Sequence, residues 1–351
     1  MTRKVYGAIP ISMFRLAHLS DPHLGPLPQA GLRAFASKRV LGLLSWHLRR
    51  RHIHVGRSLQ AVAQDVRAQG FDHIAVTGDL ANISLPQEFH LARAWLDALG
   101  PSDKVTVVPG NHDAYVGLDW ARGLHNWAPF MTGDDGKEPA GPKDFPFLRV
   151  RGPVALIGLS TAQPSSPLTA TGAVGPEQLA AAETLLRQTG AADLFRIVLI
   201  HHPPQASAAA WRKRLRDAPA VREMLGRAGA ELVLHGHLHR SLLGRIPGPK
   251  GDIPVIGVVS ASTDPESHYG AGGYHALSID RHDGNWRLGV EIRRIELAAK
   301  ACHAESAFTL DLARAACNCR PSGKPGKRRM SAVNDTMRKF GYPRTTLIET
   351  Q

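Results

Sequence analysis

The sequence has few cysteines and no long apolar run. Its three cysteines, Cys302, Cys317 and Cys319, lie close to the C-terminus, so no disulfide framework can hold the main body together. No stretch approaches the roughly 18–20 apolar residues that a membrane-spanning helix needs. Residues 1–13 also lack the apolar core and the cleavage site of a signal peptide. We therefore expect a cytoplasmic protein.

The composition excludes wholesale disorder, because 43% of the 351 residues are hydrophobic and 21% are charged. This length allows two domains, or one large α/β domain with appendages. Lys and Arg number 43 against 30 Asp and Glu, which gives a formal charge of +13. A nucleic acid, an acidic membrane surface or a small phosphorylated molecule would each fit this excess, and so would mere solubility.

Short apolar runs rich in β-branched residues alternate with amphipathic stretches, which is typical of an α/β fold. The last three strands lie closer together with no helix between them, so the back half should add antiparallel strands. The predicted strands are residues 14–20, 73–77, 105–108, 154–159, 196–200, 232–234, 255–260, 275–280 and 286–295, and the predicted helices are residues 58–69, 86–99, 176–188 and 220–228.

Two segments differ from the main domain, which we place at residues 14–297. Residues 29–57 contain seven Lys or Arg and no acid, and we interpret them as a basic amphipathic insertion after the first strand. Residues 298–351 contain ten Lys or Arg against four Asp or Glu. Their Pro-, Gly- and Lys-rich part cannot build a core, so we expect a mobile basic tail.

The insertion has two interpretations that the sequence leaves open. In a helix, Leu41, Leu44 and Leu48 would share one face, with the basic residues 49–51 at its end. Such a face either packs on the domain, or the segment meets an anionic membrane surface or steers an anionic substrate. At a membrane surface, the protein would be peripheral at its inner face. The insertion's three histidines are expected to be exposed; they are His47, His52 and His54.

Five clusters of polar residues each follow a predicted strand. Because the carboxyl ends of parallel strands share one edge of a sheet, these side chains should meet where ligands bind in α/β folds. The clusters are Asp21-Pro22-His23, Gly78-Asp79, Gly110-Asn111-His112-Asp113, His201-His202-Pro203-Pro204 and Gly236-His237-Leu238-His239. Any one of them alone would more often cap a turn or satisfy a polar contact. All five in this order indicate a metal site.

This series resembles the calcineurin-like metallophosphoesterase superfamily, whose motifs are DxH, GD, GNH[DE], a later His and GHxH. It looks closest to the class III cyclic-nucleotide phosphodiesterases, which share the GNHD and HHPP motifs. The resemblance spans residues 15–239. It implies a four-layer α/β/β/α sandwich with two mixed β-sheets, and a phosphoester hydrolase with a dinuclear metal site.

The resemblance also implies a role for each residue. Asp21, His23 and His239 would hold one metal ion. Asn111, His201 and His237 would hold the other, and Asp79 would bridge both. His201 is preferred over His202 because family members keep the His two positions before the first Pro. The imidazole and carboxamide ligands favour transition metals such as Mn, Fe or Zn over Mg or Ca.

Two further residues are candidates for catalysis. In the family, the residue that corresponds to His112 stabilises the transition state or protonates the leaving oxygen, while the two metals activate water for in-line attack on phosphorus. Asp113 would either orient the His112 ring or cap the next turn.

The motifs bind metal and phosphate, but they do not identify the rest of the substrate. Asn82 stands where purple acid phosphatases have Tyr, which argues against a tyrosinate-bound ferric site. The first expectation is a phosphodiesterase acting on cyclic nucleotides of the 3',5'-cyclic AMP type. A membrane-associated hydrolase of a phospholipid or lipid pyrophosphate comes next. A nuclease ranks third, and a non-catalytic scaffold is disfavoured by the complete ligand set.

Overall fold

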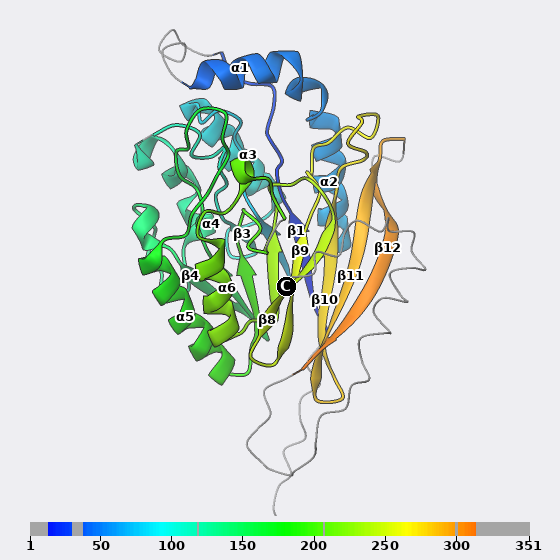
Figure 1. Cartoon of the computed structure of the whole chain (residues 1–351). Coiled ribbons are helices and arrows are strands. Elements are labelled where there is room, and N and C mark those ends of the chain that lie inside the picture. Colours follow the sequence, from blue (N-terminus) through cyan, green and yellow to red (C-terminus); the bar gives the residue numbers. More distant parts are fainter. Residues whose placement is uncertain (1–12, 30–37, 118, 206–207, 299–300, 314–351) are drawn as a thin grey trace, which may run out of the picture.

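The computed structural model describes residues 13–29, 38–117, 119–205, 208–298 and 301–313. Two six-stranded sheets form the centre of the molecule (Figure 1). The first has the order β12-β11-β10-β1-β2-β3, in which β1, β2 and β3 are parallel and the others antiparallel. Its strands are β1 (Phe14–Leu19), β2 (His73–Val76), β3 (Val105–Val107), β10 (Gly273–His282), β11 (Asn285–Glu296) and β12 (Ala301–Leu312).

The second sheet has the order β4-β5-β6-β7-β9-β8. Strands β5, β6, β7 and β9 are parallel, and an antiparallel strand closes each edge. Its strands are β4 (Phe147–Arg151), β5 (Val154–Gly158), β6 (Phe195–Leu199), β7 (Leu232–His235), β8 (Leu242–Gly248) and β9 (Gly251–Gly257).

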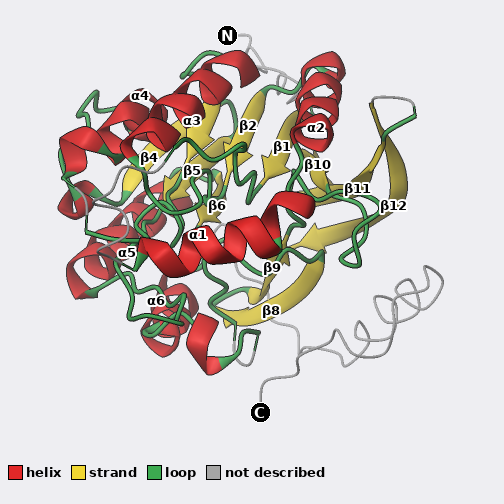
Figure 2. Cartoon of the chain, turned by 90° about the horizontal axis from the view of Figure 1, so that it is seen from above, coloured by secondary structure: helices red, strands yellow, loops and turns green. Residues whose placement is uncertain are grey.

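Helices form the outer layers, and one further helix lies across the end of the sandwich (Figure 2). Helices α2 and α3 pack on the first sheet, whereas α5 and α6 pack on the second through a separate apolar cluster. The helices are α1 (Arg39–Leu48), α2 (Gly56–Gln69), α3 (Pro86–Leu99), α4 (Ala128–Met131), α5 (Pro176–Ala191) and α6 (Ala218–Ala228). Among the described residues, no helix combines the length and apolarity that crossing a bilayer requires.

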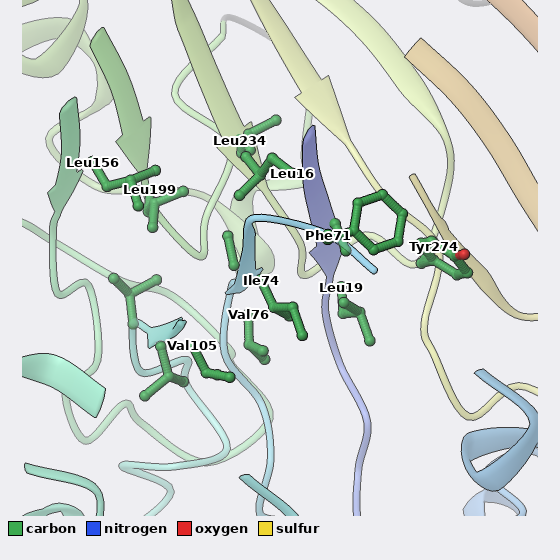
Figure 3. Close-up of a cluster of buried hydrophobic side chains, with 14 of the residues drawn as sticks. Leu16, Leu19, Phe71, Ile74, Val76, Val105, Leu156, Leu199, Leu234 and Tyr274 are labelled. Carbon is green, nitrogen blue, oxygen red and sulfur yellow. The ribbon is translucent and has the colours of Figure 1, made fainter. Parts of the chain in front are cut away.

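The main core lies between the two sheets (Figure 3). Leu16 and Ile74 contribute to it from the first sheet, and Leu156, Leu199 and Leu234 from the second. The parallel strands β2, β3, β5, β6 and β7 are buried along their whole length, which explains why they appear in the sequence as short, largely apolar runs. The predicted four-layer sandwich with two mixed sheets is confirmed.

All predicted strands and helices are present, with bounds that differ by a few residues at their ends. Strands β4 and β8 were missed. Each of them pairs with its neighbour in a hairpin at a sheet edge, where one half-exposed face leaves only a weak apolar pattern. The turns after β4 and β8 contain Gly152-Pro153 and Pro249-Lys250, respectively.

The tail prediction was wrong for its first part. Residues 301–312 form β12, which pairs with β11 along its length. Phe308, Leu310 and Leu312 alternate with polar residues, and their apolar face packs on the core. Average composition concealed this alternation, because the basic residues that follow dominate it. The rest of the tail lies outside the described residues.

Helix α1 leaves its leucines exposed. Leu41, Leu44 and Leu48 are 41%, 55% and 66% exposed, whereas Trp46 is buried. Within residues 29–57, residues 39–48 form a helix, α1, with exposed leucines and a buried Trp46. The packing interpretation of its leucine face was wrong, because Trp46 and Gly42 are the residues that face the domain.

Two buried histidines make stability depend on pH. Burial and the neighbouring arginines Arg149 and Arg294 lower the pKa of His73 and of His275, respectively, to about 3, against about 6.5 in an unfolded chain. Below about pH 6.5 the unfolded chain takes up protons that the folded chain does not. The free energy of unfolding should then fall by up to about 1.4 kcal/mol per pH unit for each histidine, down to about pH 3.

Urea unfolding of the metal-free protein between pH 7 and pH 4 tests this. His73→Gln and His275→Gln should each flatten the dependence on pH by about one proton. The exposed His125 supplies the matched control, since His125→Gln should leave the slope unchanged. Equal slopes in all three variants would contradict the expectation.

Candidate metal centre

The polar clusters meet at one edge, where the loops after the parallel strands run side by side. The amide of Asp21 donates to the carbonyl of Gly78 over 2.9 Å, and that of His23 donates to the carbonyl of Asp79 over 3.1 Å. The loop after β7 joins them, because the amide of His237 donates to the Asp21 carboxylate over 2.9 Å. Backbone pairing between loops thus fixes which side chains face one another.

One group of side chains gathers around Asp21. Its Oδ1 lies 3.1 Å from Nε2 of His239, and that nitrogen lies 3.3 Å from Nε2 of His23. Asp21, His23 and Asp79 also place ligand atoms within 4.8 Å of one another. These are spacings at which carboxylate and imidazole groups can share one metal ion.

A second group gathers on the other side of Asp79. Asp79, His201 and His237 again have ligand atoms within 4.8 Å of one another. Nε2 of His201 lies 3.3 Å from Oδ2 of Asp79 and 3.2 Å from Oδ1 of Asn111. Asp79 belongs to both groups, so it occupies the position that a bridging ligand requires.

The imidazoles are oriented by backbone carbonyls. Nδ1 of His201 lies 2.6 Å from the carbonyl oxygen of Thr77, and Nε2 of His237 lies 2.8 Å from that of Lys213. Such contacts fix the ring and leave the opposite nitrogen for a metal. His202 differs, because both of its ring nitrogens are engaged, by Thr161 and by the carbonyl of Ala170.

The backbone of the candidate ligands is strained. Five of these residues adopt left-handed φ angles of 40–68°, a region of backbone conformation that residues other than glycine rarely occupy. They are Asp21, His23, Asp79, His237 and His239. Each costs about 1–3 kcal/mol and persists only where the surroundings enforce it. Two motif glycines have a steric role, because a side chain at Gly78 or Gly110 would collide with the loop opposite it.

Charge and burial are matched within the site. Asp79 is only 2% exposed. Burial opposes its charge, but the imidazoles of His201 and His112 hold the pKa of this carboxyl well below its ordinary value. Conversely, burial disfavours a charged His201, yet the Asp79 carboxylate raises the pKa of His201 to about 9. A buried carboxylate surrounded by imidazoles has the donor set and the charge that a pair of transition-metal cations fits.

His112 adjoins both groups. Its amide donates to Oδ1 of Asp79 over 2.7 Å, and its ring centroid lies 5.1 Å from that of His23. Nδ1 lies 2.6 Å from the carbonyl oxygen of Asn82. This contact orients the ring beside the candidate metal ligands.

Asp113 makes hydrogen bonds to backbone amides, and these do not orient the ring of His112. Its carboxylate accepts three hydrogen bonds of 2.8 Å, from the amides of Asp79, Ala81 and Gly110. It therefore joins the loops after β2 and β3, and the contact to the His112 ring is made by Asn82 instead. Of the two alternatives, the structure favours the turn-capping one.

Sequence reasoning missed two residues of the insertion that reach the site. His54 was expected to be exposed, but it is 6% exposed, and its ring centroid lies 4.5 Å from that of His23. Arg50 extends to within 2.9 Å of His23 and 3.2 Å of His112. Neither carries a local signal, because His52 and Arg51 beside them are exposed as expected.

The sequence profile of calcineurin-like phosphoesterases matches residues 14–241, which is more than half of the chain. The chain belongs to the calcineurin-like phosphoesterase family. Comparison with curated proteins yields no match. The family accounts for the order of the polar clusters along the chain, and a dinuclear metal site is its shared feature.

Solved structures resemble the chain in fold. A dimetal phosphatase from Danio rerio has a TM-score of 0.56 at 14% identity, with 87% of this chain and 100% of that chain covered. A purple acid phosphatase from yellow lupin (Lupinus luteus) seeds has a TM-score of 0.51 at 14% identity, with 86% of this chain but 54% of that chain covered. At such identities the likeness concerns the fold alone.

Removing the shared carboxylate should affect both metal positions. We expect Asp79→Asn to lower the metal content from about two ions per chain toward none, whereas His23→Ala should lose about one. Mass spectrometry of protein-bound metal measures the content. The exposed Asp97 of α3 is the control, since Asp97→Asn should retain the wild-type value. An Asp79→Asn protein that binds both ions as tightly as wild type would contradict the bridging role.

Proposed function

We propose that this phosphoesterase hydrolyses phosphodiesters with two transition-metal ions, of which Mn, Fe and Zn suit the ligands. The observation that carries the proposal is the position of Asp79 between two groups of imidazole and carboxylate ligands. Asp21, His23 and His239 would hold one ion. The other would be held by the side chains of Asn111, His201 and His237.

The metal ions and the residues of the chain would have separate tasks. The two ions would supply Lewis-acid activation of the phosphate and of the attacking water. The chain's own residues set the geometry, because hydrogen bonds between the loops fix the carboxylates and carbonyl contacts fix the imidazoles. His112, beside Asp79 and His23, is placed to contact the phosphate and to stabilise charge on it or protonate the leaving oxygen.

Cyclic nucleotides are the first substrate class that we propose, because the chain shares the GNHD and HHPP motifs of class III phosphodiesterases. We expect metal-loaded protein to hydrolyse bis(p-nitrophenyl) phosphate with a higher kcat/KM than p-nitrophenyl phosphate. It should also cleave 3',5'-cyclic AMP. Asp79→Asn should abolish each activity. A preference for the monoester would contradict a diesterase, and intact cyclic AMP would remove the nucleotide substrate.

A second candidate is a phosphoester carried by a lipid at an anionic membrane surface. Seven of the ten exposed large hydrophobic side chains in the described part of the chain lie on α1 or on loops at the same edge as the site: Val40, Leu41, Leu44, Leu48, Leu168, Trp211 and Tyr269. Soluble proteins rarely gather apolar side chains in this way unless a partner covers them.

The charge of α1 points to an anionic lipid surface as that partner. Arg49, at the end of the helix, is exposed, and residues 29–57 contain no acid. An apolar helix face beside cationic residues is the arrangement of interfacial helices. Because α1 packs over the loops after β1, β2 and β3, docking through it would bring the site edge to the headgroups.

Vesicle co-sedimentation tests the docking surface. The protein should bind vesicles of phosphatidylcholine with phosphatidylglycerol and not vesicles of phosphatidylcholine alone, and binding should weaken with salt. Leu44→Ser and Leu48→Ser should each weaken it about tenfold, as expected for one lost leucine contact, and Arg49→Ser should weaken it at low salt. Leu91→Ser, at an exposed leucine of α3, should have no effect. Absence of binding at low salt would remove the lipid candidate.

A further inference from the structure

Arg50 is a cation in the site without a carboxylate partner. Its guanidinium lies 2.9 Å from Nδ1 and 3.1 Å from Nε2 of His23, and 3.2 Å from Nδ1 of His112. Within the described residues it forms no ion pair with Asp or Glu. Both neighbours are imidazoles, which supply no negative charge. The carboxylates of Asp79, Glu88 and Asp21 act on the guanidinium only from a distance, so no contacting anion offsets its desolvation.

The turn that carries Arg50 is held rigidly. Ile53 and His54 donate backbone hydrogen bonds to the Arg50 carbonyl over 3.0 and 2.9 Å. The backbone of His54 forms an isolated antiparallel β-bridge with Thr263, and Nδ1 of His54 lies 2.9 Å from Oγ of Ser262. The segment is thus fixed to the loop after β9, so the guanidinium position follows from the fold.

Only the middle one of three consecutive arginines turns inward. Arg49 and Arg51 are exposed, whereas Arg50 is half-buried. General basic character would place all three in solvent. Arg50 begins the short 3-10 turn of residues 50–52 and lies beside His23, a candidate metal ligand.

We propose that Arg50 binds the phosphate of the substrate. An oxyanion held at the metal centre would receive charge-assisted hydrogen bonds from the guanidinium. Two divalent ions would outweigh the carboxylates of Asp21 and Asp79, and Arg50 adds to this excess, so an anionic phosphate would offset part of the positive charge. The planar guanidinium can donate two parallel hydrogen bonds, which also orient the phosphate.

This inference rests on the proposed phosphodiester hydrolase, but it is tested by binding. Calorimetric titration of the full-length, metal-loaded protein with inorganic phosphate should give a Kd that rises roughly 10- to 100-fold in Arg50→Ala, as expected when a charge-assisted hydrogen bond is lost. Arg50→Lys should recover part of the affinity, since it keeps a point charge. Metal content should stay at the wild-type value in both variants.

Arg51→Ala is the matched control, because it removes the same charge from the neighbouring exposed position. Its phosphate affinity should stay within about twofold of wild type, as long-range screening predicts. Equal phosphate affinities in Arg50→Ala and Arg51→Ala would overturn the proposal, and so would a loss explained entirely by lost metal. In the first case Arg50 would only support the insertion.

Hydrolysis assays separate this inference from the proposed function. If wild type binds phosphate through Arg50 yet cleaves no phosphoester, the hydrolase proposal fails and the phosphate site stands. If wild type cleaves diesters while Arg50→Ala has an unchanged KM and kcat, the hydrolase stands and the role of Arg50 is refuted.

Discussion

A buried carboxylate is the constraint on which the rest of the site depends. Asp79 follows a fully buried strand, and its side chain lies 2% exposed between the two sheets' loop regions. Removing an ionised carboxylate from water is costly unless cations and hydrogen-bond donors surround it. The amide of His112 and the ring of His201 meet part of that demand, and metal ions would meet the rest. The neighbouring candidate ligands adopt left-handed backbone angles, and this strain is the conformational cost of gathering them around the carboxylate.

Much of the fold could be predicted because parallel strands are buried along their length. A continuous apolar run such as residues 197–200 indicates a strand without knowledge of its partner, and a polar cluster after it indicates the ligand edge. Edge strands are different. The tail strand β12 combines a half-exposed face with a basic neighbourhood, so its apolar alternation is outweighed by average composition. Its pairing with β11 depends on tertiary structure and not on the local sequence pattern.

The candidate site divides in the same way. His23 and Asp79 stand directly after strands, so their position in sequence indicates their position in space. Arg50 and His54 come from an insertion whose local pattern predicts exposure, and only the contact with residues 260–264 turns them inward. Asp113 illustrates a third case. Its place next to His112 suggests a catalytic contact, but three amides opposite it capture the carboxylate.

The insertion joins two properties that the metal ligands leave undetermined. On its inner side Arg50 faces the centre, and on its outer side the leucines of α1 face solvent. Trp46 packs against Gly25, and a side chain at Gly42 would collide with Ile83, so the helix is seated on the loops that carry the ligands. A cyclic nucleotide and a lipid phosphoester would place the same phosphate on the same metal ligands. The two substrates would differ in the part of the molecule that extends from the phosphate toward α1. Residues 38–57 are therefore the part of the site edge that the family motifs do not specify.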